Sequence, residues 1–168
     1  MEGLVNWFIN ALDGIGTGWV AFIISMVPIL ELRGGLLAAS VMHVDILKAV
    51  PICILGNLIP VPFILLFITP IFNWLKKTKL FRPMVEKLEA KAMGKSDRIQ
   101  KGYFLGLVLF VGIPLPGTGA WTGSLIASLL NIPFKKSFPA VVLGVLVAAV
   151  IMSAVSYGLL GSVMALFA

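Results

Sequence analysis

The sequence predicts an all-α integral membrane protein. Of its 168 residues, 60% are hydrophobic and 12% are charged, whereas soluble domains have roughly 45–50% apolar and about 25% charged residues. The charged side chains are too few to cover the surface of a soluble domain. The apolar residues lie in long uncharged runs. This composition excludes a water-soluble globular enzyme. The length predicts a single membrane domain over residues 1–168.

The first apolar segment, residues 14–42, is interrupted at its centre by Glu31 and Arg33. As a helix, each arm would be roughly 15–24 Å long, which is too short to cross about 30 Å of hydrocarbon. We therefore expect a re-entrant helical hairpin, which turns at residues 28–35 and leaves the membrane on the side where it entered. The alternative is an ordinary membrane helix with a kink.

Residues 49–75 are uncharged and long enough to form a spanning helix, because a span needs about 20 apolar residues. Trp74 beside Lys76 is typical of an anchor at the membrane surface. Prolines within the run predict a kink; they are Pro51, Pro60, Pro62 and Pro70.

Residues 76–101 carry nine basic and three acidic side chains, a net charge of +6, and the rest of the chain sums to zero. The positive-inside rule predicts a cytoplasmic linker that lies against anionic headgroups. Nucleic-acid binding is the weaker alternative because long apolar runs flank the segment. Apolar residues recur here at helical spacing, and Gly94 supplies a stop, which predicts an amphipathic helix in the cytoplasmic interface. A helix that binds a partner protein would show the same pattern. The apolar residues are Phe81, Met84, Val85, Leu88 and Ala92.

Residues 102–134 are uncharged but broken at residues 112–119, which are rich in proline and glycine. Basic residues flank both ends of the segment, so the positive-inside rule places both ends in the cytoplasm. We therefore expect a second re-entrant hairpin. The uncharged residues 137–168, which include Pro139, predict the second spanning helix.

The two halves of the chain match each other at an offset of 88 residues. Residues 18–58 align without gaps to residues 106–146, with 13 identities in 41 positions, where composition alone would give roughly four. The match predicts two repeats, about 14–75 and about 102–168, joined by the linker. One spanning helix separates the first hairpin from the linker, so the hairpins enter from opposite faces and the repeats are inverted. Inverted repeats with broken helices are typical of secondary transporters and imply a cavity near the midplane.

The tip of the first hairpin, where the chain turns at residues 28–35, is charged, and this charge predicts a binding site. An ionisable residue at membrane depth costs about 2.5–3.5 kcal/mol and marks a functional site by default. We expect Pro28, Gly34 and Gly35 to form the broken tip, which would let Glu31 and Arg33 face one cavity. Glu31 would exchange a proton, and Arg33 would hold a phosphate or carboxylate through its planar donor fork. The alternative is a structural pair whose charges neutralise each other and pin the hairpin.

The tip of the second hairpin, around residues 112–121, carries no charge. Its prolines and glycines leave backbone amides and carbonyls free to coordinate a ligand. Thr118 adds a hydroxyl and Trp121 a large amphipathic ring. A tight turn packed against the first tip is an equally good interpretation. Asn57, inside the first span, is expected either to hydrogen-bond across the bundle or to line the cavity. The candidate binding residues of the second tip are Pro114, Pro116, Gly117, Thr118, Gly119 and Trp121.

Two motifs, PILELRG at residues 28–34 and PLPGTGAW at residues 114–121, resemble the prokaryotic small multidrug export protein family over nearly the whole chain. The layout is also similar to the wider DedA-type superfamily. That resemblance implies two facing re-entrant hairpins and a link to lipid-carrier translocation and proton-dependent drug resistance. It also implies a role for a carboxylate and arginines near the tips. Glu31 and Arg33 match this pattern, whereas the second tip has no arginine.

The sequence therefore predicts a membrane transporter, proton- or ion-coupled, that moves a small amphipathic or lipid-like substrate. The alternatives are an uncoupled lipid or lipid-carrier flippase or scramblase, and a non-transporting membrane scaffold. An enzyme is not expected because no Asp pair, His-rich metal site or Ser/His arrangement lies at membrane depth. Cys53 and His43 are the single residues of their types, so no disulfide framework, metal or cofactor is expected.

The predicted partners are membrane lipids and a small amphipathic or anionic lipid-like substrate, and no nucleic acid. With two complete spans per chain, a homodimer is compatible with the sequence. The predicted location is the cytoplasmic (inner) membrane, with several passes, the linker inside and both termini outside.

Overall fold

The computed structural model describes residues 2–12, 14–78, 82–93, 102–115 and 117–159. These residues form helices and turns, with no β-strand among them. In chain order, the elements are α1 (Glu2–Ala11), α2 (Thr17–Met26), α3 (Glu31–Val41), α4 (Ile46–Leu58), α5 (Pro60–Leu75), α6 (Arg82–Met93), α8 (Tyr103–Gly112), α9 (Ala120–Leu129), α10 (Phe134–Ser153) and the π-helix η1 (Ala154–Leu159).

Two long apolar helices dominate the fold. One runs over Ile46–Leu75 (30 residues) and the other over Phe134–Gly158 (25 residues). At 1.5 Å per residue they are about 45 and 38 Å long, more than the roughly 30 Å of a hydrocarbon core. Both predicted spans are therefore present in length and composition, and each begins three residues before the predicted start. Residues 160–168 of the predicted second span lie outside the described residues.

The first long helix divides where the sequence predicts a kink. α4 ends at Leu58 and α5 begins at Pro60, since a proline nitrogen has no hydrogen to continue the helical ladder and fits best at the first turn. Pro51 and Pro70, by contrast, lie inside α4 and α5.

Two short helix pairs flank these long helices, and a proline ends the first helix of each pair. Val27, before Pro28, has φ −72° and ψ 130°, and Ile113, before Pro114, has φ −82° and ψ 118°. A following proline disfavours the helical conformation of the residue before it. α2 and α8 therefore stop at the positions that the sequence predicts.

The predicted role of Gly34 and Gly35 in breaking the first tip is wrong. Both residues are helical in α3, and the break lies before them. Their lack of a side chain serves close packing instead, because a Cβ at Gly35 would overlap the Ser25 hydroxyl and one at Gly34 would lie 2.7 Å from Leu30 Cβ. Gly35 lets α2 and α3 approach each other closely, and Gly34 leaves room for the Leu30 side chain at the start of its own helix.

Unusual backbone conformations recur 88 residues apart. His43 and Asn131, which follow the C-terminal ends of α3 and α9, both adopt the left-handed conformation common at such ends. α4 and α10 begin at matching positions, Ile46 and Phe134. The matched positive φ angles are 81° at Ile29 and 75° at Gly117, 50° at Glu31 and 144° at Gly119, and 56° at His43 and 54° at Asn131.

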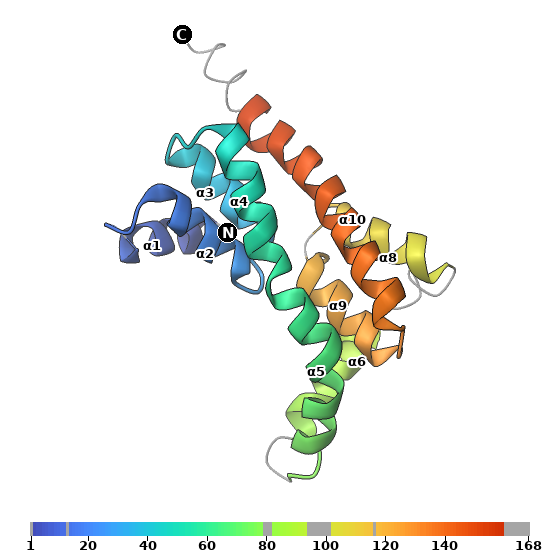
Figure 1. Ribbon diagram of the computed structural model, residues 1–168. Coiled ribbons are helices and arrows are strands. Elements are labelled where there is room, and N and C mark those ends of the chain that lie inside the picture. Colours follow the sequence, from blue (N-terminus) through green and yellow to red (C-terminus); the bar gives the residue numbers. More distant parts are fainter. Residues whose placement is uncertain (1, 13, 79–81, 94–101, 116, 160–168) are drawn as a thin grey trace.

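Figure 1 shows α2 and α3 beside α4, and α9 beside the continuing α5, while α10 runs next to this long helix and packs on α8. Glycines allow two of these contacts. A Cβ at Gly56 of α4 would lie 2.5 Å from the Phe22 carbonyl of α2, and one at Gly144 of α10 would lie 2.6 Å from Val111 Cβ of α8. Close approach over small residues is a common way for membrane helices to associate.

Each long helix also contacts the short helices of the other half. The Thr69 hydroxyl of α5 lies 2.7 Å from the Ser128 hydroxyl of α9. In the other half, the Ser40 hydroxyl of α3 donates to the Ser156 carbonyl of η1 at 2.8 Å. The two halves of the chain are therefore interlocked.

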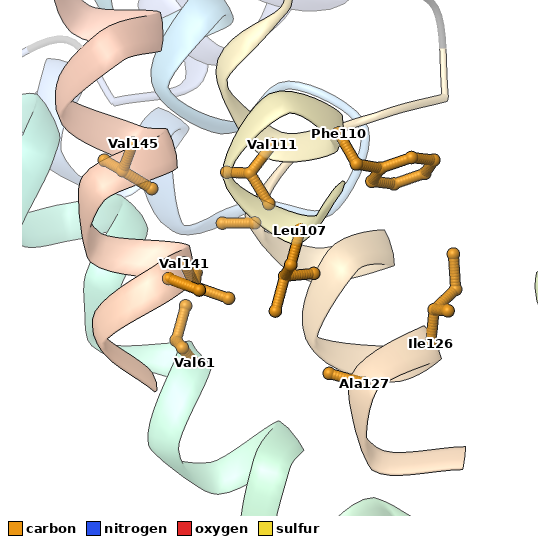
Figure 2. Packing of buried hydrophobic residues seen from close by; sticks show 10 residues of the cluster. Val61, Leu107, Phe110, Val111, Ile126, Ala127, Val141 and Val145 are labelled. Atoms are coloured by element: carbon orange, nitrogen blue, oxygen red, sulfur yellow. The ribbon is translucent and has the colours of Figure 1, made fainter. Parts of the chain in front are cut away.

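The largest buried cluster joins α5, α8, α9 and α10 and contains Val61, Leu107, Phe110, Val111, Ile126, Ala127, Val141 and Val145 (Figure 2). A second cluster joins α2, α3, α4 and α10 around Leu32, Leu36 and Cys53. These two clusters fix the short helices against the long ones and so hold both breaks in place.

Two helices lie outside this arrangement. α6 covers the predicted amphipathic segment, with Val85 buried at 2% exposure and Met84 exposed. α1 is not predicted from the sequence. The spacing of Val5, Phe8, Ile9 and Leu12 is helical, however, and these residues pack together against α2 and α3. That spacing was the signal for α1.

Candidate functional site

The two breaks in the short helix pairs meet in the middle of the fold. Residues 27–30 separate α2 from α3, and residues 113–119 separate α8 from α9. We call these segments, with the first residues of α3 and α9, the first tip and the second tip. Side chains of the first tip hydrogen-bond to the backbone of the second tip across a sequence separation of more than 80 residues.

Glu31 binds the beginning of α9. Its Oε2 accepts a hydrogen bond from the Ala120 amide and its Oε1 accepts one from the Trp121 amide, each at 3.2 Å. The first amides of a helix have no partner inside the helix, and the helix dipole favours a negative charge there. Gly119, which precedes α9, offers no side-chain cap. The carboxylate of one tip therefore caps the helix of the other.

Arg33 binds the loop of the second tip. Its Nη1 donates to the Leu115 carbonyl at 2.5 Å, and its Nη2 donates to the Thr118 carbonyl and, at 3.1 Å, to the Thr118 hydroxyl. The Thr118 hydroxyl also donates to the Ile113 carbonyl at 2.9 Å, which closes the loop on itself. The planar guanidinium thus holds carbonyls that the proline-rich loop leaves without helical partners.

The sequence leaves open a structural pair in which Glu31 and Arg33 neutralise each other and pin the first hairpin. No salt bridge links these two side chains, both of which lie in the described part of the chain, and each binds the second tip instead. They are 6% and 8% exposed. Their opposite charges still lie close together, which lowers the cost of burying either one.

Trp121 makes a third connection between the tips. Its indole Nε1 donates to the Met26 carbonyl, the last of α2, at 3.2 Å. A buried tryptophan N–H usually finds such a partner. The indole ring is thereby held at the junction of the tips.

A cavity of about 570 Å³ lies beside the joined tips, within the range of 300–1,000 Å³ that is typical of small-molecule sites. Its polar side chains are those of Glu31, Arg33, Thr118 and Thr122. The remaining wall is mostly apolar. The full lining is Pro28, Ile29, Glu31, Arg33, Ile64, Ile68, Phe72, Gly117, Thr118, Trp121, Thr122 and Leu125.

Six predicted site residues line this cavity: Pro28, Glu31, Arg33, Gly117, Thr118 and Trp121. Gly119 lies against the Glu31 carboxylate. Pro114 is half-buried and belongs to the tip but not to the cavity wall. Pro116 lies outside the described residues. Gly34 and Gly35 pack inside the first helix pair, and Asn57 is 2% exposed with its side-chain oxygen unpaired.

The wall that α5 contributes to the cavity is not predicted from the sequence. Ile64, Ile68 and Phe72 recur every fourth residue and so share one face of that helix. This spacing was visible in the sequence, but a spanning helix is apolar on every side, so nothing distinguished the cavity face from the lipid face.

The described residues contain no group of three or more His, Cys, Asp or Glu side chains placed to hold a metal ion. Among the residues that line the cavity, Glu31 and Arg33 are the charged ones. The site is thus a mainly apolar cavity whose wall contains one acidic and one basic group.

A family model described as "Putative small multi-drug export protein" matches residues 31–151. The chain belongs to this family. The match begins at Glu31 and contains Arg33 and the second tip, whereas Pro28 and Ile29 of the cavity wall precede it. No match to the chain is found among curated proteins or among solved structures. The family name describes an export protein of membranes, and the two long apolar helices agree with that location.

Proposed function

We propose that this member of the small multi-drug export family is a proton- or ion-coupled transporter that moves a small amphipathic or lipid-like substrate through the cavity at the tips. The observation that carries the proposal is the position of Glu31 and Arg33. Both line the cavity, and both hold the two tips together. Glu31 exchanges the proton, and Arg33 binds an anionic group of the substrate.

We further propose that the chain is a single membrane domain of two inverted repeats, residues 14–75 and 102–168, each a re-entrant hairpin followed by a spanning helix. The 88-residue recurrence of positive φ angles supports the repeat. The length of α2, α3, α8 and α9 supports the hairpins, because ten or eleven residues give about 15–17 Å of helix, half of a bilayer core. Backbone that is not helical is tolerated at membrane depth where protein or a cavity satisfies it.

Charge supports an orientation in the cytoplasmic membrane with residues 76–101 inside and both termini outside. The +6 linker follows α5 directly, whereas the first 30 residues carry Glu2 and Asp13 and no basic side chain. The positive-inside rule favours this asymmetry.

The test is transport by purified protein in liposomes, with the anionic amphipathic dye anilinonaphthalene sulfonate as the probe. We expect a pH gradient to drive flux of this dye in the parent and not in the Glu31→Gln variant. The matched control is Glu86→Gln, because Glu86 is an exposed glutamate of α6 that pairs with Arg82 and does not line the cavity. Unchanged flux in Glu31→Gln would refute the coupling mechanism.

The apolar wall also supports a second candidate function, uncoupled movement of lipids. A headgroup-labelled phospholipid that crosses the liposome membrane without a pH gradient would favour a flippase or scramblase. A folded protein that moves neither probe, with tip variants indistinguishable from the parent, would favour the scaffold.

A further inference from the structure

The bond between Glu31 and α9 needs both oxygens of an ionised carboxylate. The Ala120 amide donates to one oxygen and the Trp121 amide to the other. A protonated carboxyl group keeps one good acceptor oxygen and turns the other into a hydroxyl whose hydrogen must point elsewhere. Hydrogen bonds to an ionised acceptor are also roughly twice as strong as neutral ones. Protonation therefore weakens both bonds that Glu31 makes to the second tip.

The first tip holds strained backbone that the second tip does not. Ile29 and Glu31 have φ angles of 81° and 50°, in the left-handed region that side chains with a Cβ disfavour. The matching positions of the second half are Gly117 and Gly119, which adopt positive φ without that cost. A strained conformation persists only while its surroundings hold it, and such residues are typical of switches. The partner that holds Glu31 is the start of α9.

Arg33 is the other charged group that faces this carboxylate. It lies two residues along α3, and the second tip, α5 and α2 contribute no charged side chain to the described lining of the cavity. Arg33 binds loop carbonyls rather than Glu31, so its bonds to the loop do not need the carboxylate to be ionised. The proton-sensitive contact between the tips is therefore the one made by Glu31.

We propose that the Glu31 carboxylate is a latch between the tips: ionised, it caps α9 and keeps the two tips joined beside the cavity, and protonated, it releases α9 and lets the tips separate. The strained backbone at Ile29 and Glu31 relaxes when the latch opens, which favours the open form once the proton is bound. This latch deepens the proposed function and rests on it for the claim that the cavity carries substrate.

The experiment uses Trp121 as the reporter, because its indole is hydrogen-bonded across the tips. The other tryptophans, Trp7, Trp19 and Trp74, are 61%, 63% and 67% exposed, so phenylalanine can replace them without loss of buried contacts. In this single-tryptophan chain in detergent, Trp121 emission and its quenching by acrylamide are followed from about pH 4 to about pH 9. We expect acidification to shift the emission to longer wavelength and to increase quenching, in a one-proton transition about two pH units wide.

Two variants remove the latch. Glu31→Gln places an amide group where the carboxylate accepts a backbone N–H, and a Cβ in Gly119→Ala would occupy the place of the carboxylate itself. Both should show the acid-form emission at every pH. The matched control is Gly16→Ala, since Gly16 also precedes a helix with a positive φ of 87° but has open space around its Cβ position. This control should titrate as the parent does.

A pH-independent Trp121 signal in the parent would overturn the proposal, and so would a transition that persists unchanged in Glu31→Gln. If the latch variants fail to fold, amide hydrogen exchange of the unmodified chain provides the second measurement. Protection of the Ala120 and Trp121 amides, corrected for intrinsic exchange, should then be lost with the same midpoint, and constant protection would overturn the latch. Neither measurement needs a substrate. Absent flux with an intact titration would refute the proposed transport alone, and proton-driven flux with a pH-silent Trp121 would refute the latch alone.

Discussion

Replacement of Arg33 by lysine tests how the guanidinium joins the two halves of the protein. Arg33 makes three hydrogen bonds to the second tip, through two different nitrogens. A lysine ammonium has the same charge but only one nitrogen, so we expect it to keep one of these bonds and lose two. Side-chain hydrogen bonds between membrane helices contribute about 0.6 kcal/mol on average and up to about 1.7. Because these bonds carry a charge and are buried, the upper part of that range applies, and two lost bonds cost about 2–3 kcal/mol.

The assay is unfolding in mixed micelles as the fraction of a denaturing detergent rises, followed by far-UV circular dichroism and extrapolated linearly to zero denaturant. Arg82→Lys is the control, because Arg82 is exposed and its pair with Glu86 lies within one helix; it should unfold where the parent does. If Arg33→Lys unfolds within about 0.5 kcal/mol of the parent, the fork geometry does not join the tips and the reasoning fails.

Further substitutions test other parts of the fold. Gly56→Ala should destabilise the protein by about 1–3 kcal/mol in the same assay, because its Cβ would lie 2.5 Å from the Phe22 carbonyl and push α2 away; an unaffected midpoint would mean that the helices are not in close contact. Asp45→Ala removes a cap that accepts a backbone N–H of α4 at 2.8 Å, and should cost about 1 kcal/mol and speed amide exchange in the first turn of α4. Ile68→Trp should lower the flux of anilinonaphthalene sulfonate about tenfold by filling the cavity, whereas Phe67→Trp, on the exposed face of α5, should not. Equal flux in these two variants would place the substrate elsewhere.

The helices were predictable because composition and proline position decide them. The long uncharged runs predict the two long helices. Pro60 begins a helix because its missing N–H is not needed there, and Pro28 and Pro114 end helices because each disfavours the helical conformation of the residue before it. The functional interest of Glu31 and Arg33 also follows from the sequence, since charges at membrane depth are rare.

The partners of those charges were not predictable. The spacing of Glu31 and Arg33 within one motif allowed the two charges to pair with each other. The structure instead joins each side chain by hydrogen bonds to backbone groups more than 80 residues away. Backbone amides and carbonyls are the same in every sequence, so no residue pattern marks them as partners. The prediction for Gly34 and Gly35 is wrong for a similar reason. Adjacent glycines are compatible with a break in a helix and with close packing of a helix, and only their neighbours in the fold, Leu30 and Ser25, decide between the two.

The crossed contacts between the halves constrain how the protein can be made. Ser40 on α3 cannot make its hydrogen bond until Ser156 has been synthesised, 116 residues later. Ser128 on α9 binds Thr69 of α5, a helix that is synthesised well before α9. A ribosome therefore delivers the first helix pair to the membrane long before its last neighbour exists. The first half must persist there with an unfinished surface, and neither half can complete its packing alone. Separately expressed halves, cut within residues 94–101, should accordingly be degraded singly and recovered together.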